Sequence, residues 1–451
     1  MNRRMMIVCA ASAAALVASL ATIAAQPKPT KRTAAPPPAA SAGFDQQISN
    51  HAQALLEEGR RIFRFDTFGS EAFWGDQLEL HKAIAGEKNG GVGPGVSPKT
   101  ALAVGLKVDA AAIPAALAQQ IKAGKVDLDD PATTIALLKI NAVVGVTART
   151  DARGNVTSMG IQCAICHSTV DDSFAPGIGK RLDGWAARDL NIGKIVSLAP
   201  NLSPFTNLLG VDVETVKKVL LSWGPGRFDA ELDKDGKALR PDGQQAGTLI
   251  PPAFGLAGVN LHTWTGFGSV PYWNAYVGAT EMHGAGTFYD ARLNNEQQYP
   301  VAAKSGAGNT RGKPDRITSK LAALHFYQLS IPAPKPPAGS YDKAAFERGK
   351  TLFEGAARCA TCHVPPLFTE PGDNLHAPAE IGVDSFQADR SPTHKYRTAP
   401  LAGLWSHQKG GFYHDGRFAT LIDVVNHYNT VLNLNLGDAD KRDLVEYLKG
   451  L

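Results

Sequence analysis

Two pentapeptides of the form Cys-x-x-Cys-His carry the residues of this chain whose types and spacing best indicate chemistry. They are Cys163-Ala-Ile-Cys166-His167 and Cys359-Ala-Thr-Cys362-His363. Two thiols at this spacing can form thioethers with both vinyl groups of one porphyrin, and the next histidine can supply an axial nitrogen to the iron. The motifs therefore predict two covalently bound haem c groups, each held by its two cysteines and ligated by its histidine.

Other uses of a Cys-x-x-Cys pair explain these motifs less well. A redox dithiol does not require the histidine that follows both pairs. A zinc site brings its cysteine pairs much closer than the roughly two hundred residues that separate these two. The only other cysteine, Cys9, lies in the N-terminal leader, so no cysteine of the mature chain is left for a structural disulfide.

The N-terminal residues have the pattern of an export signal. A positively charged start at residues 2–4 precedes an apolar run over 5–25, which ends in a small-residue cleavage site at Ala25. We expect residues 1–25 to be a signal peptide and the protein to be periplasmic, where haem c is attached. An uncleaved leader would be an anchor, and it would then be the membrane contact of the chain.

Proline-rich runs divide the remaining chain. Residues 26–43 are rich in Pro and Ala and predict a tether, and residues 331–339 predict a stiff linker between the two haem regions. We therefore expect an enlarged N-terminal haem domain over 44–330 and a C-terminal cytochrome c domain over 340–451. The net charge is only +4, and the absence of a basic run argues against nucleic acid as a partner.

The elements that position the motifs are predicted to be helices. Residues 342–353 and 437–448 have helical periodicity and flank the second motif, as in small c-type domains. Glu57–Phe63 resembles Glu347–Phe353, but an insertion over 64–162 separates it from the first motif. We predict a mainly α fold with two cytochrome c-type haem domains, the first enlarged by this insertion, in which we recognise no motif.

Two further short sequence motifs occur downstream of the first haem motif and again, in similar form, downstream of the second. Pro252–Leu256 parallels Pro400–Leu404, and Tyr272-Trp-Asn parallels Tyr413-His-Asp. Because both pairs occur in the same order, they indicate an internal duplication.

The C-terminal words also resemble a known family. Arg397–Trp405, Gly411–Arg417 and Ala419–Val425 are similar to the C-terminal half of bacterial dihaem cytochrome c peroxidases. That superfamily includes the enzyme that matures the tryptophylquinone of methylamine dehydrogenase, and dihaem rubber oxygenases are relatives. The resemblance implies a reactive haem, an electron-port haem of higher potential and an aromatic residue between them. It also implies a small cytochrome c or cupredoxin as donor, and it leaves open a calcium ion between the domains.

The resemblance implies roles for residues near the first haem. Tyr272-Trp273-Asn274 and Glu281-Met282 are similar to the family pattern, which carries the bridging role to Trp273 and the distal acid role to Glu281. The chain departs from the pattern in two ways. Asn274 replaces an acid, and the interval from Trp273 to Glu281 is shorter than in the family.

The sixth ligand of the second haem has two main candidates. No methionine follows Cys362, which excludes a methionine ligand from the Phe-Tyr-His-Asp-Gly loop. The choice is Tyr413, as in the quinone-maturing enzyme, or His414, and neighbours in an extended loop point to opposite sides. We favour His414 because neutral imidazole binds iron without losing a proton. The reserve candidates are His394, His407 and His427.

The first haem is expected to be open, because Trp273 stands where Tyr413 and His414 stand in the second half. His81, His262 or His283 could still close it, and His81 could act as a ligand or distal acid-base group. We expect reduction of hydrogen peroxide at the first haem, with electrons delivered through the second. One alternative is a dioxygen-activating oxygenase of the rubber-oxygenase type, and another is a non-enzymatic electron carrier.

Overall fold

The structure is a computed structural model that describes residues 43–407 and 409–451. The predicted signal peptide and all but the last residue of the predicted tether lie outside the described residues. The chain divides into two units, Met1–Ser49 and Asn50–Leu451. The described part of the first unit is Gly43 and the start of helix α1. The predicted division of the second unit at residues 331–339 stays a prediction.

The described residues form a mainly α fold, which confirms the predicted secondary-structure class. The α-helices are α1 (Phe44–Phe65), α2 (Leu80–Ala85), α3 (Pro98–Ala103), α4 (Ala115–Lys122), α5 (Pro131–Lys139), α6 (Ala164–His167), α7 (Ile192–Val196), α8 (Ser203–Leu209), α9 (Val213–Trp223), α10 (Leu232–Asp235), α11 (Val270–Ala279), α12 (Pro300–Ser305), α13 (Leu321–Ser330), α14 (Lys343–Glu354), α15 (Phe386–Asp389), α16 (Leu421–Val431) and α17 (Asp438–Lys449). No described helix has both the length and the apolar character needed to cross a membrane.

Short segments complete the secondary structure. The strands pair two by two: β1 (Val108–Asp109) with β5 (Ile178–Gly179), β2 (Val146–Thr150) with β3 (Val156–Ile161), β4 (Ser168–Val170) with β6 (Arg181–Asp183), β7 (Arg227–Phe228) with β8 (Thr248–Leu249), and β9 (Thr287–Tyr289) with β10 (Asn309–Arg311). A π-helical turn spans Ala72–Gln77, and 3-10 turns span Glu87–Asn89, Ala110–Ala112, Ala291–Asn294, Thr318–Lys320, Cys359–Thr361 and Leu404–His407.

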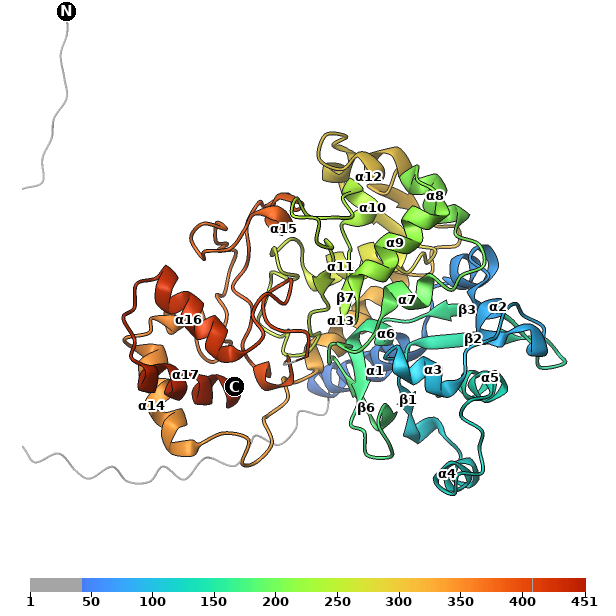
Figure 1. Cartoon of the computed structure of the whole chain (residues 1–451), viewed down its shortest axis with the longest axis horizontal. Coiled ribbons are helices and arrows are strands. Elements are labelled where there is room, and N and C mark those ends of the chain that lie inside the picture. Colours follow the sequence, from blue (N-terminus) through green and yellow to red (C-terminus); the bar gives the residue numbers. More distant parts are fainter. Residues whose placement is uncertain (1–42, 408) are drawn as a thin grey trace, which may run out of the picture. The chain divides into compact units, whose positions relative to one another are not determined.

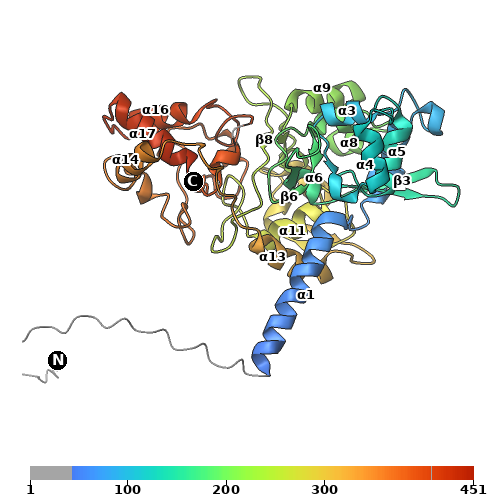
Figure 2. The same cartoon turned by 90° about the horizontal axis from the view of Figure 1, so that it is seen from below.

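Two terminal helices cross beside the second haem motif, as the sequence predicts. The Asp342 side chain accepts a hydrogen bond from the Ala345 amide and caps α14, which packs against α17 (Figures 1 and 2). The crossing is close at Gly349, where an added Cβ would lie 2.1 Å from the Asp443 carbonyl oxygen. Phe353 and Tyr447 then meet with ring centroids 5.0 Å apart. This crossing forms the core of the C-terminal region.

The first half repeats this crossing with α1 and α13. A Cβ at Gly59 would lie 2.0 Å from the Ala323 carbonyl oxygen, and the rings of Phe63 and Tyr327 lie 5.6 Å apart. Gly59 and Phe63 occupy the same places in Glu57–Phe63 as Gly349 and Phe353 occupy in Glu347–Phe353. The structure therefore confirms that these two sequence words are equivalent.

The insertion over 64–162 folds into its own apolar core. Helices α2 to α5 and the β2–β3 hairpin contribute Leu80, Val108, Leu137, Leu138 and Met159 to it. Strand β3 ends at Ile161, two residues before the first haem motif. The inserted residues therefore form one wall of the space in front of that motif.

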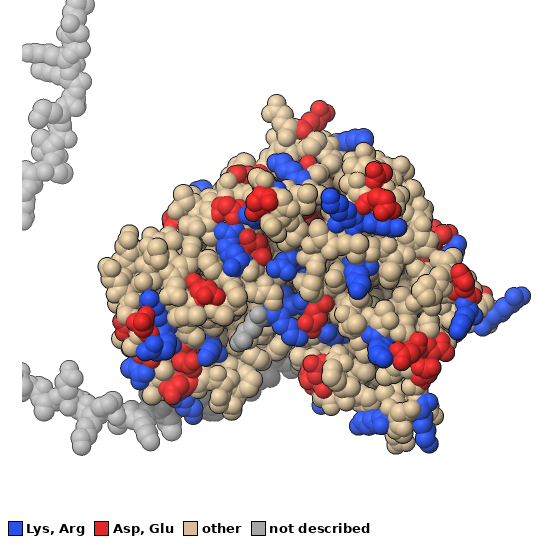
Figure 3. Space-filling model, in the orientation of Figure 1, with Lys and Arg blue, Asp and Glu red and all other residues tan. Residues whose placement is uncertain are grey.

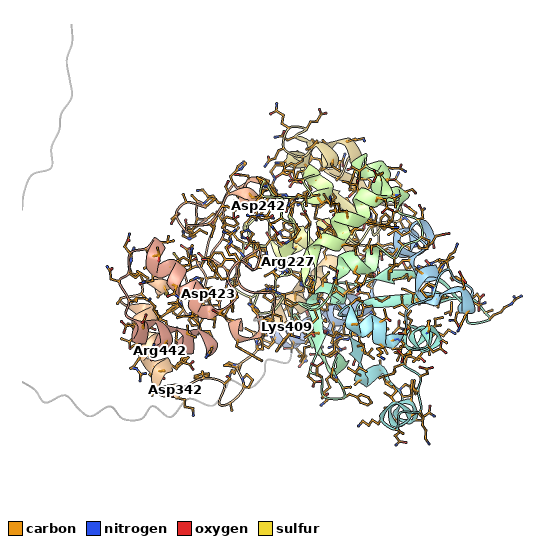
Figure 4. All side chains as sticks on the ribbon, viewed as in Figure 1. Arg227, Asp242, Asp342, Lys409, Asp423 and Arg442 are labelled. Atoms are coloured by element: carbon orange, nitrogen blue, oxygen red, sulfur yellow. The ribbon has the colours of Figure 1, made fainter. Side chains whose placement is uncertain are left out.

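Polar contacts link the C-terminal region to the rest of the second unit. Arg390, only 1% exposed, contacts Asp229 at 2.9 Å and Asp235 at 2.8 Å. The Lys409 ammonium lies 2.9 Å from the Asp189 carboxylate (Lys409 is labelled in Figure 4). On the face that Figure 3 shows, basic and acidic side chains are interspersed.

Candidate haem sites

The first motif opens onto a large cavity, which we call the haem-1 cavity. Its volume is about 340 Å³, and Cys163, Cys166 and His167 all line it. The motif helix α6 lies against Gly145, where an added Cβ would be 2.2 Å from the Ile165 backbone. The lining is mainly apolar and comes from the insertion on one side and from residues 248–282 on another. The cavity has the apolar character that a porphyrin requires.

His167 has the properties of an iron ligand. Its Nδ1 atom is buried and has no hydrogen-bond partner among the described residues. Burial lowers the pKa of His167 to about 4, and the Pro251 carbonyl only partly opposes this shift. A neutral imidazole facing an apolar cavity beside two cysteines fits the proximal ligand of a haem c.

The second motif presents the same arrangement at the haem-2 site, the space around His363. His363 Nδ1 lies 3.0 Å from the Phe368 carbonyl oxygen, so this nitrogen carries the proton and Nε2 is left to bind iron. Burial lowers the pKa of His363, and the carbonyls of Phe368 and Ala399 oppose the shift. Ala399 in this half and Pro251 in the first both directly precede the repeated word. The Pro252–Leu256 and Pro400–Leu404 words are therefore equivalent, as predicted.

The second pair of repeated words is not equivalent, and this corrects the sequence analysis. Tyr272, Trp273 and Asn274 lie inside helix α11. Tyr413 and His414 instead lie in the loop before helix α16. Because helical and loop residues present their side chains differently, Trp273 does not stand where Tyr413 and His414 stand.

The segment equivalent to the Tyr413 loop precedes α11. Thr263 has a φ of +62° and Tyr413 a φ of +69°, a left-handed conformation that is uncommon for either residue type. The residues that follow Thr263 and Tyr413 both form a hydrogen bond with Leu249. Trp264 Nε1 donates to the Leu249 carbonyl oxygen at 2.9 Å, and the Leu249 amide donates to the His414 carbonyl oxygen at 2.7 Å. Three residues further on in each loop, Gly266 and Gly416 also have positive φ angles, of +64° and +73°. This shared pattern makes Thr263 the counterpart of Tyr413 and Trp264 the counterpart of His414.

Tyr413 and His414 point in different directions, as their adjacency predicts. The Tyr413 ring packs in the apolar cluster that contains Phe353 and Cys359. Its hydroxyl is buried, and burial together with the neighbouring Tyr428 hydroxyl strongly raises the pKa of Tyr413. The His414 ring stacks on Tyr396 with centroids 5.0 Å apart, and its Nε2 lies 3.9 Å from Asp415. Tyr413, and not the favoured His414, shares an apolar cluster with the second haem motif.

Thr263 gives the haem-1 cavity a different lining from the haem-2 site. The residue lines the cavity, and its buried hydroxyl has no hydrogen-bond partner among the described residues. A threonine side chain is much shorter than a tyrosine. It leaves space where Tyr413 would place a phenol oxygen.

Glu281 lies at the haem-1 cavity, as the resemblance implies. The residue lines the cavity, and its buried Oε1 atom has no hydrogen-bond partner in the part of the chain that the structure describes. Burial raises the pKa of Glu281 well above its ordinary value, and the nearby Asp233 adds to the shift. Trp74 Nε1 donates to the carbonyl oxygen of the next residue, Met282, at 3.0 Å and so ties this segment to the insertion. A buried carboxyl with a raised pKa can exchange a proton with a molecule in the cavity.

Trp273 also lines the haem-1 cavity, but its contacts are with its own half. Its ring meets Tyr276 at 5.7 Å, and its Nε1 donates to the Phe267 carbonyl oxygen. The Lys234 ammonium lies 5.1 Å from the ring centroid. Trp264 instead contacts both halves, since Arg397 N donates to the Trp264 carbonyl oxygen at 3.1 Å. The sequence analysis did not single out Trp264.

The structure does not bring His81 to the haem-1 cavity. The lining includes Leu80 and Ile84 from the same helix α2, but not His81. Burial lowers the pKa of His81, and the neighbouring Lys82 adds to the shift. This position does not support the predicted role of His81 as a ligand or distal acid-base group, which stays a prediction. The buried histidine belongs to the packing of the insertion.

The other candidate histidines divide in the same way. His262 lines the cavity, with Nε2 3.1 Å from the Val259 carbonyl oxygen, whereas His283 stacks on Phe73 with centroids 3.4 Å apart. Of the three reserve candidates for the sixth ligand of haem 2, His427 has its Nε2 atom 2.8 Å from the Ile381 carbonyl oxygen. His407 stacks on Phe254 and His394 is exposed. His262 is the one candidate of these that the structure brings to the haem-1 cavity.

Arg397 is a half-buried cation to which the sequence analysis gave no role. It lines the haem-1 cavity, donates to the Leu261 carbonyl oxygen and leaves Nε without a partner. Burial lowers the pKa of Arg397 to about 10, and no carboxylate of the described residues forms an ion pair with it. A buried guanidinium of this kind requires an anion, and a haem propionate supplies one. The residues present therefore fit a haem at this site.

Comparisons with known proteins agree with these motifs. No protein-family model matches the chain. The methylamine utilization protein MauG of Methylorubrum extorquens is 27% identical over 157 residues, which cover 30% of this chain and 43% of that protein. This chain thus spans less than half the length of that relative. This match supports the resemblance of the chain to the bacterial dihaem cytochrome c peroxidase superfamily.

Two solved structures resemble parts of the chain. A MauG-like protein associated with microbial copper homeostasis is 18% identical, with a TM-score of 0.30 over 49% of this chain and 80% of that one. Hydrazine synthase of Kuenenia stuttgartiensis is 21% identical, with a TM-score of 0.29 over 48% of this chain and 76% of that one. At these TM-scores neither structure adds to the argument about the sites.

Proposed function

We propose that the protein is an exported dihaem c-type cytochrome that reduces hydrogen peroxide at haem 1 with electrons delivered through haem 2. The single observation that carries the proposal is the difference between Thr263 and Tyr413 at equivalent loop positions. Tyr413 would supply an oxygen ligand to haem 2, whereas Thr263 carries no comparable side chain and would leave haem 1 accessible to a small oxidant. We therefore replace His414 by Tyr413 as the proposed sixth ligand of haem 2.

The residues of the haem-1 cavity support the chemistry. When bound, haem supplies an iron that coordinates peroxide and passes electrons to it. Glu281 then takes a proton from the inner oxygen and gives it to the outer oxygen, so that the O–O bond breaks as water leaves. Two electrons and two further protons complete the reduction of peroxide to two water molecules. The buried Oε1 atom of Glu281 is free to make this transfer.

Trp264 is the proposed aromatic bridge for these electrons, in place of Trp273. Its side chain lines the haem-1 cavity, and its backbone bonds to Arg397 in the second half. The interval from Trp264 to Glu281 is also longer than that from Trp273, which removes one departure from the family pattern. A small cytochrome c or cupredoxin stays the proposed donor, and export and the calcium ion stay proposals.

The second candidate function is activation of dioxygen at haem 1. The mainly apolar lining of the haem-1 cavity favours it, because such a lining can hold an organic substrate. In that case reduced haem 1 would take up oxygen only when the organic substrate is present.

The experiment that tests the proposal measures oxidation of a reduced small cytochrome c by peroxide, with the purified dihaem protein as catalyst. We expect saturable, peroxide-dependent oxidation that is lost in T263Y and retained in T263S. Oxygen uptake with an organic substrate, without peroxide turnover, would support the oxygenase. Neither activity, with both irons six-coordinate, would identify an electron carrier and contradict the proposal.

A further inference from the structure

A second cavity, apart from the haem motifs, is lined by residues of the insertion over 64–162 and by Ile178. Its volume is about 260 Å³, and twelve of its thirteen lining residues are apolar. The exception is Thr133, whose hydroxyl donates to the Asp127 carbonyl oxygen at 2.7 Å and so is not available to a ligand. We call this space the insertion cavity. It offers no side-chain polar group that could orient a polar molecule.

The insertion cavity adjoins the haem-1 cavity. Pro98, Leu102, Val108 and Leu137 line both spaces, so a wall one side chain thick separates them. On another side the insertion cavity is lined by Ala132 and Ala136, which are exposed residues of α5. These small side chains leave an opening toward solvent. A molecule in the cavity would lie between the solvent and the haem-1 cavity.

We propose that the insertion cavity binds a small apolar molecule, of the hydrocarbon class, beside haem 1. Apolar cavities of this kind stay dry and accept apolar ligands, because water gains no hydrogen bonds there. An empty apolar cavity of this size destabilises a folded protein. A ligand that fills the cavity would offset this loss of stability. As a substrate site the cavity rests on the second candidate function, activation of dioxygen at haem 1, but its ability to bind an apolar molecule does not.

The test uses two probes, xenon gas and n-hexane, on the ferric dihaem protein. We expect xenon at the insertion cavity in crystals under pressure, and saturable binding of one n-hexane per chain by calorimetry. Ala136→Phe should fill the opening and abolish both signals. Its matched control is Ala116→Phe, at an exposed position of α4 that lines neither cavity, and this variant should bind like the parent protein.

Two outcomes would overturn the inference. The first is no xenon at the insertion cavity of the parent protein together with no saturable n-hexane binding. The second is unchanged n-hexane binding by A136F. Circular dichroism and haem absorbance identify any variant that fails to fold, in which case Ala132→Phe replaces A136F. Peroxide turnover of the same samples separates failure of the proposed function, since hexane binding without turnover leaves the cavity as a ligand site.

Discussion

The two halves of this protein share an architecture and differ at one decisive loop position. Each half crosses two helices through a glycine, at Gly59 and Gly349, and each places a backbone carbonyl near its motif histidine. Each then bends a loop through a left-handed residue, which is Thr263 in the first half and Tyr413 in the second. Under the proposed function, this single side chain would separate the reactive haem from the electron-transfer haem.

The halves also differ in what surrounds the motif. In the second half, α14 reaches its motif after a few residues, whereas the first half inserts residues 64–162. That insertion supplies much of the apolar lining of the haem-1 cavity and a further cavity beside it. The half with the short loop side chain is therefore also the half with room for a ligand.

Exchanging the two loop side chains should produce the largest effect. In T263Y the new phenol should cap haem 1, and in Y413T haem 2 should lose its ligand. We expect T263Y to lose peroxide-dependent donor oxidation completely, while optical spectra show both haems attached. If T263Y keeps its activity and a high-spin haem, Thr263 is not the counterpart of Tyr413.

Neutralising the buried acid should produce the next largest effect. We expect E281Q to lower the rate of peroxide reduction about 100-fold, since general acid-base groups contribute at least this much. Because the pKa of Glu281 is raised by burial, the parent rate should increase with pH through a value above that of an ordinary carboxyl. Stopped-flow rates across pH give both results. An equal pH profile in E281Q would remove Glu281 from the reaction.

The two tryptophans offer a matched pair for electron transfer. We expect W264F to slow reduction of haem 1 through haem 2 about tenfold, which corresponds to a modest increase in barrier. W273F should leave this rate nearly unchanged, because the aromatic contacts of Trp273 among the described residues are with Phe267, Tyr272 and Tyr276 of the first half. Flash reduction of the donor, followed at each haem, measures the rates. The reverse order of effects would restore Trp273 as the bridge.

A smaller effect concerns the stability of the second half. His376 lies 2.6 Å from Glu370 and 2.8 Å from Glu380. Burial alone would lower the pKa of His376, but these carboxylates outweigh it and raise the pKa above its ordinary value. The charged form should therefore stabilise the fold fully below about pH 6.5 and lose this contribution as the pH rises through the raised pKa.

The variant H376Q measures this contribution. We expect it to lower the free energy of unfolding by about 1 kcal/mol at acidic pH, and by less at alkaline pH. Chemical denaturation followed by circular dichroism at both pH values checks the difference. A destabilisation that is the same at both pH values would mean that His376 contributes packing and not charge.

Local sequence patterns predict much of this fold. The motif residues, the capped helix at Asp342 and the Glu57–Phe63 repeat all follow from residue type and spacing, and the structure contains each as expected. The predicted equivalence of Tyr272-Trp-Asn and Tyr413-His-Asp is wrong, because two aromatic residues can suit a helix as well as a loop. Ser269 followed by Pro271 is a helix-start signal that could have placed Tyr272 within α11.

The remaining site residues depend on the tertiary structure. Thr263 and Arg397 have ordinary residue types, and only their buried, unpartnered polar atoms mark them. His81 has a reactive residue type, but the fold turns it into the packing of the insertion. Burial and partners, which sequence spacing does not report, separate these three residues.

Low-temperature EPR of the purified ferric protein, repeated after one-electron reduction, tests the central claim most directly. We expect one high-spin signal from haem 1 and one low-spin signal from a histidine–tyrosine haem 2. The high-spin signal should disappear in T263Y and persist in T263S. Two low-spin signals in the parent protein would show that both irons are capped, and would contradict the assignment of haem 1 as the open, reactive site.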